Sequence, residues 1–246
     1  ASTDEAFRPV NLFNGPDGAM YVVDMHRGII QHSAYMTPYL RKHLEKKGLD
    51  KIIGMGRILK ITNETQGVHK IPELDNASSS ELIELLYHKN GWVRDKAQQT
   101  LLFKGSEKDK ADLEAVVENT SAPIAQMHAL YALKGLDILD FDLLIEIAAI
   151  SEADVVAHAL LLLETSGRAD NIETVFKLAS ELAEKEDPTI DLYLLNTIGS
   201  MSSQNAELFL PLLSQLAEQN PGPIFQEALM SNTDYQFITT DLDSDN

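Results

Sequence analysis

Five segments that can each begin a helix recur along this chain at intervals of 30 to 36 residues. Each opens with a residue whose side chain can accept hydrogen bonds from the free amides of a first helical turn, and several have proline in that turn. They are Asn90-Gly91, Ser121-Ala122-Pro123, Ser151 to Asp154, Asp187-Pro188 and Asn220-Pro221. Helix starts at one regular period are typical of stacked repeats, so we expect a row of helical hairpins.

The segments between these starts carry apolar residues at helical spacing and predict five hairpins. The expected pairs are 81–87 with 92–103, 109–118 with 123–133, 141–150 with 153–165, 172–185 with 188–199, and 206–219 with 221–230. Ala97, Ala129 and Ala159 fall at equivalent places in the second helices, 32 and 30 residues apart. Small residues there allow close helix packing, so residues 81–233 are expected to form an α-solenoid in a mainly α protein.

Residues 1–62 have a different pattern, which predicts a small β-strand and helix module. Phe7 to Phe13 and Ala19 to Met25 alternate as strands around the turn residues Asn14 to Gly18. A short helix is expected over Tyr39 to Lys47, and a third strand over Gly56 to Thr62. Three strands expose edges and one apolar face, so another part of the protein should cover this sheet.

Two polar segments flank the predicted solenoid. Residues 63–80 form a linker that ends in a capping box of Ser78 and Glu81, and residues 234–246 form an acidic tail. Asp241, Asp243 and Asp245 match the first ligand positions of a calcium loop, but the chain has no glycine or glutamate at the positions that follow. A solvated tail is the better interpretation, and the small sheet and the acidic end together suggest a fragment of a longer protein.

The charge is unevenly distributed. Of the net −18, residues 1–62 contribute 9 positive and 6 negative side chains (+3), and residues 63–246 contribute 11 and 32 (−21). Such a field repels phosphate backbones, so we expect no nucleic-acid partner for the repeats, whereas a basic protein or a cation would be attracted. The alternative is a surface whose charge only keeps a long solenoid in solution.

Composition narrows the chemistry further. The absence of cysteine excludes disulfides, thiolate nucleophiles, cysteine-ligated zinc, iron–sulfur clusters and thioether-linked haem. No run approaches the roughly 20 apolar residues that a membrane helix needs, so no membrane span is expected in this chain. No motif of a known catalytic or metal-ligand set stands out.

Two stretches together resemble a known family. Residues 7–24, Arg27 to His32 and Gly56 to Ile61 look like the final blade of the β-propeller in bacterial membrane-bound dehydrogenases, relatives of the glucose and sorbosone dehydrogenases. Residues 85–98 and 122–133 resemble the HEAT-like repeats that follow that propeller. The resemblance covers residues 7–165 and weakens beyond them.

This resemblance implies a multidomain periplasmic or extracytoplasmic oxidoreductase acting on sugars or polyols, with c-type haem and a quinone cofactor. The chain departs from that pattern in having one blade, where a propeller needs at least four, and no Cys-x-x-Cys-His motif. Any such cofactor therefore belongs to other parts of the parent protein, and we expect these residues not to catalyse a reaction alone.

The candidate binding residues are Asp17, Asp24, His26, Arg27 and His32, which cluster in sequence around the first two turns. In a propeller, such positions face the central channel or a loop surface, where they could hold a substrate, a quinone or a metal. The alternative is structural: Asp17 shapes its turn and Asp24 ends a strand. No spacing here matches a known ligand set, so no metal site is predicted.

His128 and His158 occupy equivalent positions in two second helices. They could stack as a pair on one face, although two histidines alone are too few for a zinc site. The alternative, which we favour, places each at the margin of a helix interface as a half-buried packing residue.

The resulting hypothesis is a non-catalytic scaffold that supports the propeller and offers an acidic surface to a haem domain or a basic redox protein. Its partners would be the other domains of the parent protein and such a redox protein. The alternative is a free-standing HEAT-repeat module for protein–protein interaction, with no redox role.

Overall fold

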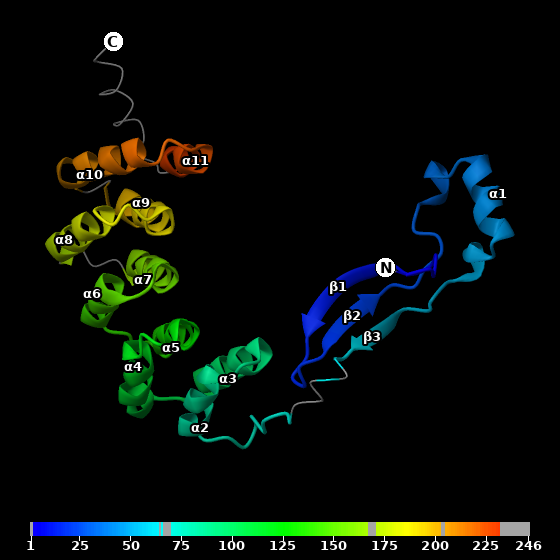
Figure 1. The fold of residues 1–246 in the computed structure, drawn as a ribbon, viewed down its shortest axis with the longest axis horizontal. Coiled ribbons are helices and arrows are strands. Elements are labelled where there is room, and N and C mark those ends of the chain that lie inside the picture. Colours follow the sequence, from blue (N-terminus) through cyan, green and yellow to red (C-terminus); the bar gives the residue numbers. More distant parts are fainter. Residues whose placement is uncertain (1, 64, 66–69, 167–170, 203–204, 232–246) are drawn as a thin grey trace, which may run out of the picture. The chain divides into compact units, whose positions relative to one another are not determined.

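The computed structural model describes residues 2–63, 65, 70–166, 171–202 and 205–231. The chain divides into two compact units, Ala1–Glu73 with Lys89–Val93 and Leu74–His88 with Arg94–Asn246. The described residues are mainly helical, with a small antiparallel sheet near the N-terminus, as the sequence predicts (Figure 1). The acidic tail 234–246 lies outside the described residues.

The sheet of the first unit has the strand order β1-β2-β3, with both neighbouring pairs antiparallel. Its strands are β1 (Pro9–Asn14), β2 (Met20–Asp24) and β3 (Arg57–Ile61). Leu12, Val22 and Leu59 lie opposite one another across the three strands. Strands β2 and β3 fall inside the segments predicted to form them, and β1 extends one residue beyond its predicted end at Phe13.

The turn between β1 and β2 is the tight hairpin that its glycines predict. The Gly15 amide donates to the Ala19 carbonyl at 2.8 Å, and Gly18 adopts a φ of 79°, in the left-handed region that favours glycine. Asn90 also belongs to this unit, and its side-chain amide donates to the Gly15 carbonyl at 2.8 Å.

Helix α1 (Pro38–Lys46) connects β2 to β3, together with short 3-10 helices at Ser33–Tyr35 and Leu49–Lys51. Thr37 caps α1, because its hydroxyl accepts from the Leu40 amide at 3.2 Å and Pro38 fills the first helical position. Gly28 packs tightly against Leu49: a Cβ at residue 28 would lie 2.1 Å from the Leu49 carbonyl oxygen.

Apolar side chains remain exposed on both faces of the sheet. Leu12 and Ile61, on the same face as Val22, are 58% and 50% exposed, and Phe13 and Ile58, on the other face, are 54% and 68% exposed. The sequence predicted one exposed apolar face. The structure corrects this, because the described residues expose apolar side chains on both faces.

The second unit consists of helices that follow one another in pairs, joined by short connections (Figure 1). Its helices, with α3 beginning in the first unit, are α2 (Ser79–Glu84), α3 (Gly91–Lys104), α4 (Lys110–Glu118), α5 (Pro123–Gly135), α6 (Phe141–Ile150), α7 (Ala153–Ser166), α8 (Ile172–Ala183), α9 (Pro188–Ser202), α10 (Ala206–Gln219) and α11 (Pro223–Ser231). Short 3-10 helices lie at Leu85–Tyr87 and Glu107–Asp109.

Three of the predicted helix starts have the expected chemistry. The Asn90 side chain accepts from the Trp92 amide at 3.0 Å, and the Asp187 carboxylate accepts from the Thr189 amide at 2.9 Å. Ser78 and Glu81 form the predicted capping box at the start of α2. These side chains satisfy amides that have no partner within the helix.

Three others differ from the prediction. Ser121 accepts no helical amide, because Ala122 is the residue that precedes α5, and Ser151 ends α6 with a hydroxyl that has no hydrogen-bond partner. Helix α11 begins at Pro223 rather than at the predicted Pro221. A proline can open a helix at either position, and the sequence alone does not distinguish the two.

The helix pairs bury one continuous apolar core. Within each pair α4 packs on α5, α6 on α7 and α8 on α9, and the second helices α5, α7, α9 and α11 also contact one another in succession. Ala97, Ala129 and Ala159 are completely buried, as their equivalent positions predict. Among the described residues, no helix has both the length and the apolar character needed to cross a membrane.

We expect Ala129→Leu to destabilise the second unit by roughly 1 to 3 kcal/mol, because the added methyl groups overpack a close helix contact. Denaturant unfolding followed by circular dichroism measures this change. Ala111→Leu, at an exposed position of α4, is the matched control and should leave stability within about 0.5 kcal/mol of the wild type. Equal unfolding of the two variants would refute the packing of Ala129.

One carboxyl group is buried in this core. Asp191 of α9 is 1% exposed; its Oδ2 accepts from the Asn220 side chain at 2.9 Å, while its Oδ1 has no hydrogen-bond partner. Burial raises the pKa of Asp191; the Asn220 bond lowers it, and the negative charges of Asp187 and Glu186 raise it further. The folded protein therefore holds the Asp191 proton more tightly than the unfolded chain does.

The free energy of unfolding should accordingly fall as the pH rises from 3.8 through the raised pKa of Asp191. Asp191→Asn should remove that pH dependence and stabilise the protein at neutral pH by roughly 1 kcal/mol, since no buried charge remains. Thermal unfolding between acid and neutral pH tests this. Asp154→Asn, at an exposed position in the first turn of α7, is the control and should keep the wild-type slope.

Candidate functional site

The buried carboxylate of Asp24 lies at the end of β2 and is only 1% exposed. Its Oδ1 accepts from the backbone amides of Arg8 at 2.7 Å and His26 at 2.9 Å, and its Oδ2 accepts from Arg57 Nε at 2.8 Å. Burial raises the pKa of Asp24, but the hydrogen bonds from the Arg8 and His26 amides and from Arg57 outweigh it and leave the pKa lowered. Asp24 is therefore an ionised anchor for three chain segments.

Asp4 extends this charged cluster towards the surface. Its Oδ2 accepts from Arg57 at 2.9 Å and contacts His26 Nε2 at 3.1 Å, while its Oδ1 accepts from the Ala6 amide at 2.9 Å. His26 adopts a φ of 40°, a left-handed conformation that is uncommon for a residue other than glycine. The cluster holds that conformation, because both the His26 backbone and its ring contact carboxylates.

Sequence reasoning identified Asp24 and His26 but missed Asp4 and Arg57. The two missed residues lie 20 residues before and 33 residues after Asp24. The available signal was Arg57, the second residue of the predicted third strand, which falls opposite Asp24 once the register is known.

Asp17 belongs to a separate site at the other end of β2, which places it roughly 15 Å from Asp24. Its carboxylate accepts from the Ala19 amide at 3.1 Å and the Tyr21 hydroxyl at 3.0 Å, and it forms an ion pair with Lys60. The bond to Lys60 is the main cause that lowers the pKa of Asp17 to about 2, with the Ala19 and Tyr21 bonds contributing against the opposing effect of burial. These contacts agree with the structural alternative, in which Asp17 shapes the turn.

Arg27 and His32 lie on the loop that follows β2. Arg27 Nε donates to the Ile29 carbonyl at 2.9 Å, and His32 Nδ1 accepts from the Ala34 amide at 3.2 Å while its ring meets Tyr35 edge-on at 6.2 Å. No contact between His32 and the Asp24 cluster occurs within the described residues. The structure thus brings together Asp24, His26 and Arg27, through a hydrogen bond and a shared pocket, and places Asp17 and His32 elsewhere.

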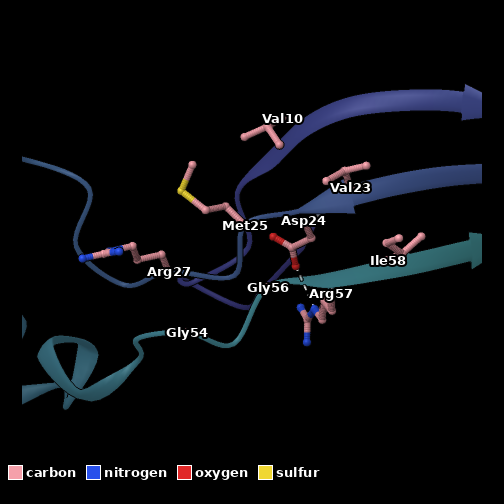
Figure 2. A pocket seen from close by; sticks show the side chains of 9 residues that line it. All are labelled: Val10, Val23, Asp24, Met25, Arg27, Gly54, Gly56, Arg57 and Ile58. Carbon is pink, nitrogen blue, oxygen red and sulfur yellow. Dashed lines mark hydrogen bonds and ion pairs between the residues drawn. The ribbon is translucent and has the colours of Figure 1, made fainter.

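A pocket of about 520 Å³ lies beside the Asp24 cluster (Figure 2). Val10, Val23 and Ile58 come from the three strands, whereas Met25 and Arg27 come from the loop after β2. The complete lining is Val10, Val23, Asp24, Met25, Arg27, Gly54, Gly56, Arg57 and Ile58. Figure 2 shows the Asp24 carboxylate directed at Arg57, so the pocket combines an aliphatic surface with a charged end.

The two repeat histidines do not pair with each other. His128 Nδ1 contacts Gln98 at 2.7 Å, and His158 Nδ1 contacts the Tyr131 hydroxyl at 2.9 Å, so each meets the second helix of the preceding pair. The pKa of His128 is lowered, mainly by burial; the charge of Asp95 raises it, and the charge of Arg94 lowers it. Both histidines are half-buried, which confirms the packing interpretation. Among the described residues, no group of three or more His, Asp or Glu side chains is placed to hold a metal ion.

Comparison with known families gives a match at the N-terminal end of the chain. Residues 1–65 match the model of DUF7133, a domain of unknown function. No curated protein and no solved structure matches the chain. The matched region ends shortly after β3 and therefore contains the sheet, α1, the Asp24 cluster and the pocket.

Titration of Asp17 tests the geometry of the hairpin. We expect its carboxyl group to titrate near pH 2 in a carbon-detected NMR experiment, and Lys60→Met to move the pKa back towards 3.8, because the main charge partner is lost. Because the pKa of Asp17 is lower in the folded protein than in the unfolded chain, Asp17 contributes stability above pH 3.8 that is lost as the pH falls towards 2.

Lys51→Met is the matched control for this titration, since Lys51 is an exposed lysine of the same unit that makes no contact with Asp17 in the described structure. It should leave the Asp17 titration in place. If both lysine variants shifted the Asp17 pKa equally, the effect would be one of net charge, and the Lys60 ion pair would be refuted.

Proposed function

We propose that the chain is the non-catalytic scaffold region of a sugar dehydrogenase-like redox protein. In this proposal residues 1–62 form the closing blade of a β-propeller, and residues 81–233 form a HEAT-like solenoid behind it. The observation that supports it most directly is the sheet of the first unit, which has exposed apolar side chains on both faces.

A sheet of this kind is suited to lie between two others. The described residues 2–73 bury few apolar side chains, namely Ala6, Ala19, Val22 and Leu49. A stable sheet normally buries at least one face, and blades inside a propeller are covered on both faces by their neighbours. The exposed residues Leu12, Phe13 and Ile61 would provide these contacts.

The helices of the second unit support the proposal that residues 81–233 form a solenoid scaffold. Successive second helices pack on one another, and completely buried alanines recur at equivalent positions. Each pair then contacts mainly its neighbours, as repeats of a solenoid do. Such an array offers a long surface and is commonly used for binding other proteins.

Charge suggests the kind of partner. Residues 63–246 carry a net charge of −21, from 11 basic and 32 acidic side chains. A field of this sign attracts basic proteins and speeds their association. We propose a haem domain of the parent protein or a basic redox protein as the partner, in the periplasm or another extracytoplasmic space, with haem and any quinone cofactor held outside these residues.

The binding of a basic c-type cytochrome to the full chain tests this proposal. We expect the dissociation constant to rise at least tenfold between about 0.02 and 0.3 M salt, because screening weakens the attraction of exposed charges. An affinity independent of ionic strength would contradict the electrostatic part.

Two double variants make the test sharper. Glu152→Gln with Glu184→Gln removes two exposed acidic charges from the second unit and should weaken cytochrome binding several-fold. Lys42→Gln with Lys46→Gln changes the same number of charges in α1 and should leave binding unchanged or tighter. Equal binding of lysozyme, a basic protein with no redox centre, would favour the alternative of an interaction module without a redox role.

A further inference from the structure

The pocket beside Asp24 joins an exposed aliphatic surface to a positive charge. Val10 and Ile58 are 56% and 68% exposed and Met25 is 44% exposed, although all three side chains are apolar. Contiguous exposed apolar patches that polar or charged residues border are typical of binding surfaces, whereas single exposed apolar side chains are not.

The two arginines of the lining differ in their partners. Arg57 is paired with Asp24 at 2.8 Å and with Asp4 at 2.9 Å, so carboxylates already match its charge. Arg27 is exposed and forms no ion pair within the described part of the chain, where its one hydrogen bond runs from Nε to the Ile29 carbonyl at 2.9 Å. The two terminal nitrogens of its guanidinium are thus free to meet the two oxygens of a carboxylate.

The pocket is an open groove at the surface, and its size suits a small ligand. Its volume of about 520 Å³ lies within the range of roughly 300 to 1,000 Å³ that is usual for ligand sites. Gly54 has a φ of 70°, and no heavy atom lies within 4 Å of the place where a Cβ would stand. The backbone at residue 54 is therefore open to a ligand that enters from the loop end.

We propose that this pocket binds an aliphatic monocarboxylic acid, with its carboxylate on Arg27 and its chain over Val10, Val23 and Ile58. The guanidinium of Arg27, which has no carboxylate partner among the described residues, matches a monoanion better than a phosphate, which carries close to two charges at neutral pH. The aliphatic floor distinguishes such an acid from small hydrophilic anions such as acetate. All residues of this site belong to the first unit, so the site needs neither the helical part nor another domain of the parent protein.

Titration of octanoate into the full chain, followed by NMR, tests the site. We expect saturable binding with one ligand per chain and shifts centred on Val23, Met25 and Ile58. The dissociation constant should fall by about two- to fourfold for each methylene added from butanoate to octanoate, as burial of a methylene predicts. Octanol, which lacks the charge, should bind at least tenfold more weakly.

Matched variants separate the site from general effects. Arg27→Gln should weaken octanoate binding at least tenfold, and Arg41→Gln, the same change at an exposed arginine of α1, should not. Val10→Asp should abolish binding by placing a negative charge on the floor, whereas Leu12→Asp, at an equally exposed position of β1 outside the lining, should retain it. Wild-type melting curves for the variants serve as the folding control.

Several results would overturn the proposal: no saturation by octanoate in the wild-type chain, equal binding of octanol and octanoate, or equal losses in the Arg27 and Arg41 variants. A peptide with an apolar C-terminal residue that displaced octanoate at lower concentration would also overturn it, since the pocket would then be assigned to a polypeptide terminus.

Discussion

The carboxylate of Asp24 joins three segments that lie far apart in the sequence, through the Arg8 and His26 amides and the Arg57 side chain. The first unit depends on this contact because it buries so few apolar side chains. A charge that is almost completely buried is tolerated only when its oxygens are satisfied, and here each oxygen has a close donor. The strand ends, the left-handed backbone at His26 and the lining of the pocket all follow from that arrangement.

The second unit is held together mainly by apolar packing rather than by buried charge. Its helices bury a continuous set of Leu, Ile, Val and Ala side chains, and its polar groups sit mainly at the margins of helix contacts. His128 with Gln98 and His158 with Tyr131 each connect a helix to the corresponding helix of the pair before it. Gln126, Asp191 and Thr197 are buried polar residues of this unit, and Asp191 is the one with a carboxyl group, one oxygen of which is unsatisfied. One unit is thus held by polar contacts at specific points, and the other by distributed packing.

Local patterns in the sequence were sufficient for the secondary structure. Alternation predicted the three strands, and helical periodicity with buried alanines predicted the helix pairs, because both signals are contained within a few turns or residues. The prediction that Ser121 and Ser151 cap helices was wrong. Several polar residues precede each helix, and the sequence does not show which one accepts the amides. The Asp4 and Arg57 partners of Asp24 were missed because they depend on the strand register and on the path of the N-terminal segment.

The outer edges of β1 and β3 have a consequence for how the first unit behaves at high concentration. Neither edge is paired within the described residues, and both strands carry exposed Leu, Ile or Phe side chains. Such an edge is a template onto which an identical strand from another molecule can add, and repeated addition leads to insoluble assemblies. Expressed without the acidic helices, the first unit would lose the mutual charge repulsion between molecules that opposes this self-association.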